Sequence, residues 1–190
     1  GGRAFKDQAI VFVHGYNTLY EEAVYWLAQI VHDSGYTGTA VLFAWPSMGK
    51  APMYVADREA STYSRDYFEK ALLDMAALPE VKELNILAHS MGNWLAVETL
   101  RQAKMNGHGD FKGKLSDVIL ASPDLDVNVF RTQLDVIGKL PRPITILTSA
   151  DDKALALSTT LAGGVDRAGR VTANDARAIA AAERYNLQVV

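Results

Sequence analysis

Short, nearly continuous apolar runs alternate along the chain with longer segments in which apolar residues recur every three or four positions. The apolar runs cover residues 9–14, 39–45, 83–89, 117–122 and 144–149, and a sixth run at 186–190 ends the chain. Continuous apolar character, rather than strict alternation, is typical of strands that are buried on both faces of a parallel sheet. The pattern therefore predicts six strands.

The segments between these strands carry helical patterns. We expect helices over residues 21–34, 58–78, 93–105, 127–137 and 173–184. In the first of these, Ala23, Leu27 and Ile30 fall on one side, and Gly35 marks its end. Alternation of strand and helix indicates an α/β fold, with a mostly parallel sheet that is covered by helices on both faces. Because the chain shows no repeat or linker, we expect residues 1–190 to form a single domain.

The composition of the chain excludes several classes of function. The 190 residues carry a formal net charge of −3, with 49% hydrophobic and 22% charged residues, which is ordinary for a globular domain. The weakly acidic balance offers no basic stripe to bind nucleic acid, and the apolar runs are too short to span a membrane. The chain has no cysteine, which excludes disulfides, thiolate metal sites and thiol catalysis.

The strongest chemical signal lies where the strand at 83–89 meets the following helix. Ser90 falls at the tip of this strand–turn–helix segment, with Ala88 two residues before it and Gly92 two residues after it. In a nucleophile elbow, small residues at these positions allow a sharp turn that exposes the serine, and the helix start adds N–H groups and partial positive charge. We therefore predict that Ser90 is a nucleophile. The alternative is a serine that only caps the helix.

A second segment, His14-Gly15-Tyr16-Asn17, follows the first strand. In a hydrolase of this design, the loop after this strand supplies one backbone N–H to the oxyanion hole. The residue after the nucleophile, here Met91, supplies the other. We expect Gly15 to permit the tight turn and either Tyr16 or Asn17 to be the donor. The alternative is an ordinary turn whose polar residues cap the next helix.

Acidic residues follow two later strands. Asp124 comes after the fourth strand, whereas Asp151 and Asp152 come after the fifth. The chain order Ser…Asp…His of α/β-hydrolases allows either loop to supply the acid of a catalytic triad. We favour Asp152, then Asp124, then Asp151. The alternative for Asp124 and Asp126 is capping of the helix at 127–137, and for Asp151 it is a solvated turn.

None of the four histidines occupies the expected place of the general base. His89 is adjacent to Ser90, but neighbouring side chains at a sharp turn diverge, so its ring does not reach the hydroxyl. We assign His14 to bracing its loop. His32 lies late on a helix, where a histidine is favourable, and His108 precedes the acid candidates in the chain.

The general base is expected after the last strand, beyond Val190. We therefore expect this chain to be truncated at its C-terminal end and to show weak or no turnover by itself. The N-terminal Gly1-Gly2-Arg3 leaves a cut at that end open as well.

Several short motifs resemble those of a bacterial α/β-hydrolase family of unknown function. They are VHGYNT at 13–18, FAWPS at 43–47, YVAD at 54–57, SR at 64–65, AHSMGN at 88–93 and DKAL at 152–155. The resemblance implies a serine-hydrolase fold with Ser90 as nucleophile and Asp152 as triad acid. It also implies a base on a Gly-His-Ser-like segment past the end of this chain.

Two further elements of these motifs bear on substrate binding and on stability. Trp45 and Tyr54 come just after the C-terminal end of a strand, where α/β sheets bind ligands. We expect them to bind substrate as a wall of an apolar acyl pocket, with ordinary loop packing as the alternative. Asp57 and Arg65 are expected to form a structural pair.

Together these patterns predict a serine hydrolase, whether carboxylesterase, lipase-like enzyme or thioesterase. It would cleave a small-molecule acyl ester or thioester through an acyl-enzyme on Ser90, without a metal or organic cofactor and without nucleic acid. The alternative is an inactive binding or scaffold domain that keeps the fold. We expect a soluble protein of the bacterial cytoplasm, or an exported one if an upstream signal has been removed. The sequence does not indicate an oligomeric state.

Overall fold

Within residues 6–148 and 176–190, which the computed structural model describes, six parallel strands form one sheet in the order β2-β1-β3-β4-β5-β6. The strands are β1 (Gln8–Val13), β2 (Thr39–Phe43), β3 (Glu83–His89), β4 (Leu115–Ala121), β5 (Ile144–Leu147) and β6 (Leu187–Val189). Every neighbouring pair is parallel. The six predicted strands are confirmed, with ends that differ by up to two residues.

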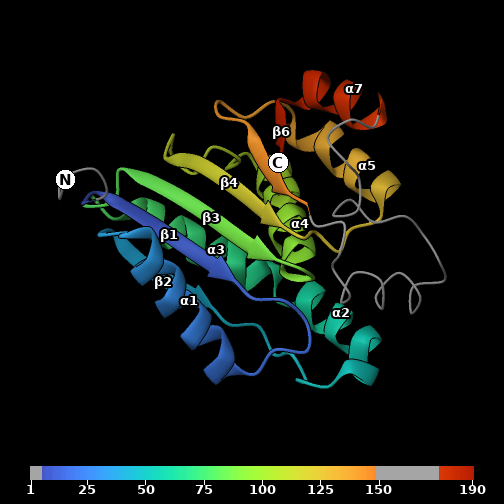
Figure 1. Cartoon of the computed structure of the whole chain (residues 1–190). Coiled ribbons are helices and arrows are strands. Elements are labelled where there is room, and N and C mark those ends of the chain that lie inside the picture. Colours follow the sequence, from blue (N-terminus) through green and yellow to red (C-terminus); the bar gives the residue numbers. More distant parts are fainter. Residues whose placement is uncertain (1–5, 149–175) are drawn as a thin grey trace.

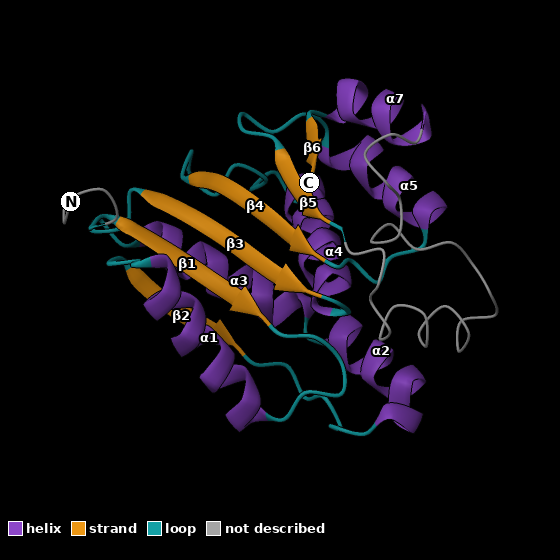
Figure 2. Ribbon diagram, in the orientation of Figure 1, coloured by secondary structure: helices purple, strands orange, loops and turns teal. Residues whose placement is uncertain are grey.

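Helices lie on both faces of this sheet, as predicted (Figure 1; Figure 2). They are α1 (Tyr20–Ser34), α2 (Tyr54–Tyr63), α3 (Arg65–Ala77), α4 (Gly92–Met105), α5 (Val127–Ile137) and α7 (Ala176–Tyr185), with a short 3₁₀ turn η1 (Ala51–Met53) before α2. One face carries α1, and the opposite face carries α3 and α4. Helix α5 packs against α4, and α7 packs against α5. No helix in the described part of the chain is long and apolar enough to cross a membrane.

The order of the strands creates a switch point in the middle of the sheet. From β1 the chain passes through α1 to β2 on one side, and it then returns through α2 and α3 to β3 on the other side of β1. In open α/β sheets, ligands bind in the crevice at the carboxyl ends of the strands where the direction of winding reverses. The fold therefore directs attention to the C-terminal ends of β1 and β3.

The helix predicted at 58–78 is two helices, because the helical path breaks at Ser64. Hydroxyl groups at and near the break bond to backbone carbonyls one turn earlier. Thr62 Oγ1 donates to the Arg58 carbonyl at 2.9 Å, and Ser64 Oγ donates to the Ala60 carbonyl at 2.9 Å. Side-chain bonds of this kind compete with helical bonds and bend the chain. The first of the two helices also begins earlier than predicted, at Tyr54.

The core lies mainly between the sheet and the α3–α4 face. Alternate residues of β3 and β4 are buried there with large side chains of these helices, such as Phe68, Leu72 and Leu95. Full burial of one such side chain contributes about 1.5–3 kcal/mol. On the α1 face, Leu87 and Ile119 are only partly buried. The expectation that the strands are buried on both faces therefore holds only in part for β3 and β4, because α1 covers only one part of its face (Figure 1).

Candidate active site

Ser90 occupies the turn between β3 and α4, at the edge of the sheet where the parallel strands end. Its backbone has a φ of 51°, in the left-handed region that residues with a Cβ atom rarely adopt. The turn is held by a bond from the Ser90 N–H to the Ala121 carbonyl at 3.0 Å. The side chain of Asn93 donates to both the Ser90 carbonyl (2.8 Å) and the Ala121 carbonyl (2.9 Å). The predicted strand–turn–helix segment is thus present, and Asn93 fastens it to β4.

Two further residues at this edge share the left-handed conformation. Asn17 follows β1 with a φ of 53°, and Ser122 follows β4 with a φ of 43°. Together with Ser90 they stand at the ends of three neighbouring strands. Each such residue costs about 1–3 kcal/mol, and strained residues tend to gather at functional sites. Ser90 is the one of these that lies between a strand and a helix in the manner of a nucleophile elbow, and it therefore marks this edge as the candidate active site.

Two glycines let the backbone of β1 approach the turn at Ser90. A Cβ atom on Gly15 would lie 2.8 Å from the Cβ of Ser90, so the loop after β1 rests directly on this serine. A Cβ atom on Gly92 would collide with the backbone oxygens of Val13 and His14. The second small residue of the elbow motif is thus required by contact with β1, which the sequence pattern did not reveal.

The loop after β1 presents two backbone N–H groups, and they differ in their partners. The N–H of Asn17 donates to Asp57 Oδ2 at 3.3 Å. By contrast, the N–H groups of Tyr16 and Met91 donate to no acceptor within the described residues. Of the two donors left open by the sequence, Tyr16 is therefore the one whose N–H stays available beside Ser90.

Asp57, in the first turn of α2, is fully buried and accepts three hydrogen bonds. Besides the Asn17 N–H, its partners are Ser47 Oγ at 2.6 Å and the Met48 N–H at 2.7 Å. The predicted pair of Asp57 with Arg65 is wrong. Arg65 instead lies on the far side of the break at Ser64 and contacts Asp66 and Glu98.

Tyr54, one helical turn before Asp57, donates from its hydroxyl to Asp124 Oδ2 at 2.9 Å. The backbone N–H of Asp124 in turn donates to the Ser90 carbonyl at 3.3 Å. Asp126 caps α5, which was the alternative given for it, since it accepts from two N–H groups of that helix at 2.8 and 2.9 Å. Asp151 and Asp152 lie outside the described residues.

His14 lies in the loop after β1, as a brace rather than at the serine. Its ring stacks on Trp45 at 5.0 Å between centroids. Its Nδ1 and Nε2 lie 2.8 Å and 3.1 Å from the carbonyls of Gly15 and Trp45, and Trp45 Nε1 donates to the His14 carbonyl at 2.8 Å. Burial lowers the pKa of His14 despite these contacts. A neutral imidazole has a single N–H and can donate to only one of the two carbonyls.

The other histidines also lack a hydrogen bond to Ser90 in the described part of the chain. His32 is exposed at the end of α1 beside Asp33. His108 pairs with Glu69 at 3.2 Å, beyond the C-terminal end of α4. His89 packs edge-on against Trp26, with the ring centroids 5.7 Å apart.

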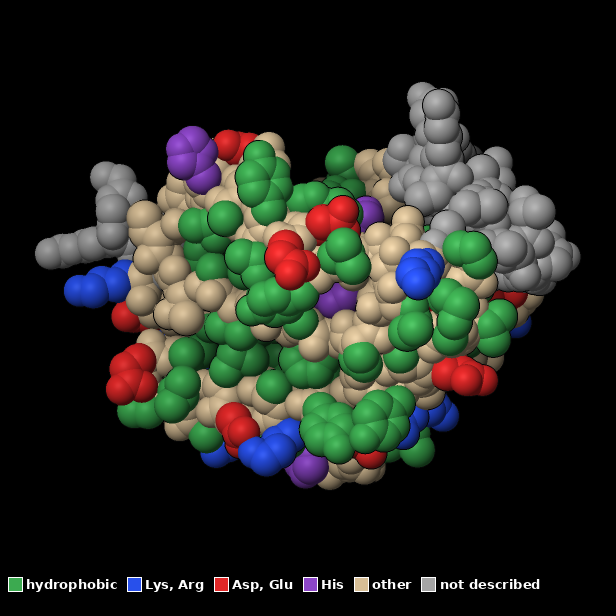
Figure 3. All heavy atoms as spheres, turned by 90° about the horizontal axis from the view of Figure 1, so that it is seen from below, with side chains coloured by type: hydrophobic (Ala, Val, Ile, Leu, Met, Phe, Trp, Pro, Cys, Tyr) green, Lys and Arg blue, Asp and Glu red, His purple; other side chains and the backbone are tan. Residues whose placement is uncertain are grey.

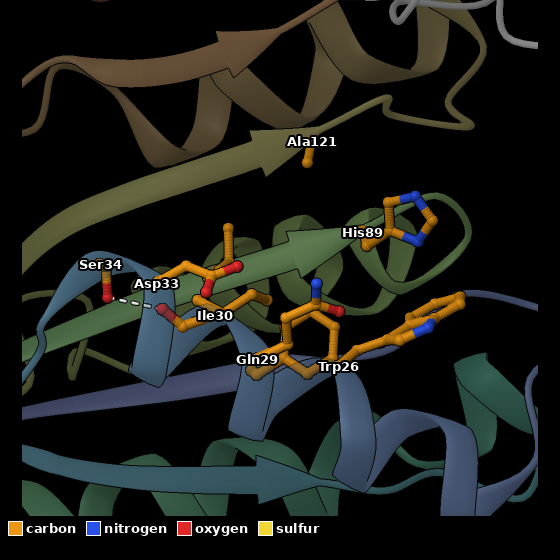
Figure 4. A pocket seen from close by; sticks show the side chains of 9 residues that line it. Trp26, Gln29, Ile30, Asp33, Ser34, His89 and Ala121 are labelled. Carbon is orange, nitrogen blue, oxygen red and sulfur yellow. Dashed lines mark hydrogen bonds between the residues drawn. The ribbon is translucent and has the colours of Figure 1, made fainter.

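His89 and Trp26 also border a groove on the α1 face of the sheet (Figure 4). Its walls are formed by one side of α1, mostly of exposed residues, and by residues of β1, β3 and β4. They are Phe12, Trp26, Gln29, Ile30, Asp33, Ser34, Leu87, His89 and Ala121. The groove is mainly apolar and open, and it contains neither Ser90 nor the loop donors.

Trp45 and Tyr54, the predicted wall of the acyl pocket, are only 3% and 6% exposed. Tyr54 packs edge-on against the ring of Tyr16 with the centroids 5.4 Å apart. Both aromatic rings are therefore buried against the loop that follows β1. No cluster of three or more histidine and acidic side chains suited to a metal is found within the described residues.

With this geometry in place, comparison with known proteins assigns a family. The chain matches, over residues 3–190, the model of a family described as alpha/beta hydrolase of unknown function (DUF900). The chain belongs to this family. No curated protein matches the sequence.

Solved structures similar to this DUF900 chain include two esterases. One is esterase B from Lactobacillus rhamnosis, described with a C4-C4 tributyrin phosphonate, at 13% identity and a TM-score of 0.52. That alignment covers 100% of this chain and 66% of esterase B, so the chain spans just under two thirds of this structure. The other is a mutant of polyneuridine aldehyde esterase, at 22% identity and a TM-score of 0.37, covering 62% of this chain and 41% of that one. At 13% identity, the similarity to esterase B shows that the two proteins share a fold.

Proposed function

We propose that this DUF900 protein is a serine hydrolase that cleaves a carboxylic ester or thioester through an acyl-enzyme on Ser90. The observation that carries the proposal is the left-handed Ser90 at the tip of the β3–α4 turn, with Gly15 of the neighbouring loop packed on its Cβ atom. This is the context in which a serine hydroxyl acts as nucleophile in an α/β-hydrolase.

In the proposed reaction, Ser90 Oγ attacks the acyl carbonyl while a general base takes the hydroxyl proton. The N–H groups of Met91 and Tyr16 stabilise the resulting oxyanion. The tetrahedral intermediate then collapses, the alcohol or thiol leaves with the proton, and water releases the acyl group in a second round. Neither half of the reaction needs a metal or an organic cofactor.

The acid of the triad is proposed among the residues of this sequence, whereas the base is proposed beyond them. Asp152 is kept as the proposed acid, although it lies outside the described residues, with Asp124 as the candidate within them. The proposed base is a histidine beyond Val190. Because β6 is parallel to β3, residues that follow β6 leave the sheet at the edge where Ser90 lies.

An apolar substrate suits the surface around this edge. Hydrophobic side chains cover much of the face on which α1 and α2 lie (Figure 3). Leu19 and Tyr20 at the start of α1, Met48 after β2 and Val55 in α2 are each at least half exposed. Leu19 also packs on Gly49, so the loops after β1 and β2 meet there. We therefore propose an apolar acyl group as the part of the substrate that is recognised.

The experiment is covalent labelling with a fluorophosphonate, combined with hydrolysis of p-nitrophenyl butyrate. We expect the intact gene product to be labelled on the peptide that contains Ser90, and Ser90→Ala to lose labelling and at least about 10³-fold in kcat. Ser122→Ala is a matched control, because Ser122 is a second left-handed serine at a strand end, and it should keep both. If the intact protein neither labels nor hydrolyses short esters, a binding or scaffold role replaces the enzyme.

A further inference from the structure

Two polar side chains in the first turn of α2 reach different parts of the site. Tyr54 and Asp57 are three residues apart and so lie on the same side of the helix. Tyr54 donates to Asp124, whose N–H bonds the Ser90 carbonyl. Asp57 accepts from the Asn17 N–H, in the loop after β1. The first turn of α2 is thus bonded to two loops at the site. One contains Asp124 and contacts the backbone of Ser90, and the other contains Tyr16, the proposed oxyanion donor.

The bonds of Asp57 also join two loops to each other. Besides donating to Asp57, Ser47 Oγ accepts from the N–H groups of Thr18 (3.4 Å) and Gly49 (3.3 Å). Asp57 and Ser47 therefore form a small, partly buried network between the loops after β1 and β2. A buried carboxylate is costly unless donors surround it, and here three donors come from chain segments that α2 must hold in place.

We propose that Asp57 is a positioning residue that fixes the loop after β1, so that the Tyr16 N–H faces the developing oxyanion. This inference rests on the proposed function and deepens it. By engaging the Asn17 N–H, Asp57 sets the orientation of the peptide that follows Tyr16. A donor displaced by a fraction of an ångström loses much of its effect on the transition state.

The charge of Asp57 provides a way to separate positioning from electrostatics. A negative charge near the oxyanion opposes it, so removal of that charge alone would favour the reaction. Asp57→Asn removes the charge and also at least one accepted hydrogen bond, because an amide has one oxygen. A fall in kcat in this variant is therefore the signature of lost positioning.

The test compares Asp57→Asn with Glu69→Gln in the intact protein. Glu69 is a matched control, because it is also a buried carboxylate with three donors, Gln102, Asn106 and His108, but these lie toward the opposite end of α4 from Ser90. For Asp57→Asn we expect kcat on p-nitrophenyl butyrate to fall about 10- to 100-fold with KM within about threefold. Glu69→Gln should keep kcat.

A second readout does not depend on activity. Hydrogen exchange followed by mass spectrometry should show amides in the peptides around residues 15–19 and 46–50 exchanging at least about tenfold faster in Asp57→Asn, and unchanged in Glu69→Gln. If Asp57→Asn does not fold, Ser47→Ala removes the three bonds that Ser47 Oγ makes with Asp57, Thr18 and Gly49, and it leaves Asp57 bonded to the N–H groups of Asn17 and Met48. Exchange should then become faster in the same two peptides.

The two readouts separate the failure of this proposal from the failure of the proposed function. Unchanged exchange in these peptides overturns the positioning role whether or not the protein is an enzyme. Faster exchange with an unchanged kcat overturns it as well, because the loop would then move without consequence for the reaction. If the wild-type protein lacks esterase activity but exchange responds as expected, the proposed function fails while the hold of Asp57 on the loop stands.

Discussion

Gly92→Ala tests whether the close approach of α4 to β1 shapes the candidate active site. Gly92 begins α4, and its φ is not in the left-handed region, so an alanine there is allowed by the backbone and even favoured by about 1 kcal/mol of helix propensity. The substitution is opposed only by the lack of space for the new Cβ atom. The new Cβ atom would lie 2.7 Å from the Val13 oxygen and still nearer to the His14 oxygen. Because ordinary contact begins at 3.4 Å, the start of α4 must withdraw by more than about 0.7 Å.

The expected magnitudes follow from this displacement. Overpacking costs about 1–3 kcal/mol, and the gain in helix propensity offsets part of it, so we expect a loss of about 1–2 kcal/mol in unfolding free energy. For a chain of this size the melting temperature should fall by about 2–8 °C. Because Ser90 lies two residues before Gly92, a shift of this size should lower kcat/KM for an ester by up to about 100-fold.

The assays are urea unfolding followed by tryptophan fluorescence, and hydrolysis of p-nitrophenyl butyrate by the intact protein. Gly35→Ala is the matched control, since Gly35 ends α1 with a φ of 65° and nothing lies within 4 Å of its would-be Cβ atom. It should lose about 1 kcal/mol through backbone strain while hydrolysis is unchanged. A Gly92→Ala protein with wild-type stability and wild-type kcat/KM would refute the reasoning, because the β1 backbone would then not limit the position of the turn.

Two further predictions concern parts of the fold that lie away from Ser90. Asp126→Ala removes the cap of α5 and should lower the unfolding free energy by about 1 kcal/mol without changing hydrolysis, as measured by urea unfolding and the ester assay. Burial opposes ionisation of Glu69, but its hydrogen-bonding partners outweigh this effect and lower the pKa of the carboxyl. A lowered folded-state pKa stabilises the fold above the unfolded value, near 4.5, and this contribution disappears as the pH falls through the folded value. The stability difference between wild type and Glu69→Gln should therefore shrink as urea titrations move from about pH 6 to about pH 3.5; a constant difference would contradict the assignment.

Features that depend on neighbouring residues could be predicted from the sequence. Continuous apolar runs marked all six strands, and the small residues around Ser90 marked the turn because both signals lie within a few positions. The break at Ser64 was missed because helical periodicity continues across it, although the nearby hydroxyl residues carried a signal of it. Partial exposure of the α1 face was missed because an apolar strand looks the same whether one or both of its faces are covered.

The contacts that assemble the site could not be predicted, because they join segments far apart in the chain. Tyr54 and Asp124 are separated by 70 positions, and Asp57 and Asn17 by 40. The Tyr-x-x-Asp motif was visible, but its partners depend on where α2 lies relative to β1 and β4. Asn93 carried a clearer signal, since a polar residue in the first turn of a helix, directly before the apolar run 94–97, indicates a bond to the backbone beside it.

The groups around Ser90 also bear on the base that the proposed reaction requires. Burial raises the pKa of Tyr16, and the nearby carboxylates of Asp124 and Asp57 raise it further, so the phenol stays protonated at neutral pH and does not accept the serine proton. His14 has both ring nitrogens beside backbone carbonyls, and Asp124 already accepts a bond from Tyr54. The described part of the chain thus surrounds Ser90 with groups that donate or that already have partners. Such groups suit the stabilisation of an oxyanion rather than the activation of a hydroxyl, so the proposed reaction needs a base that the described residues do not supply.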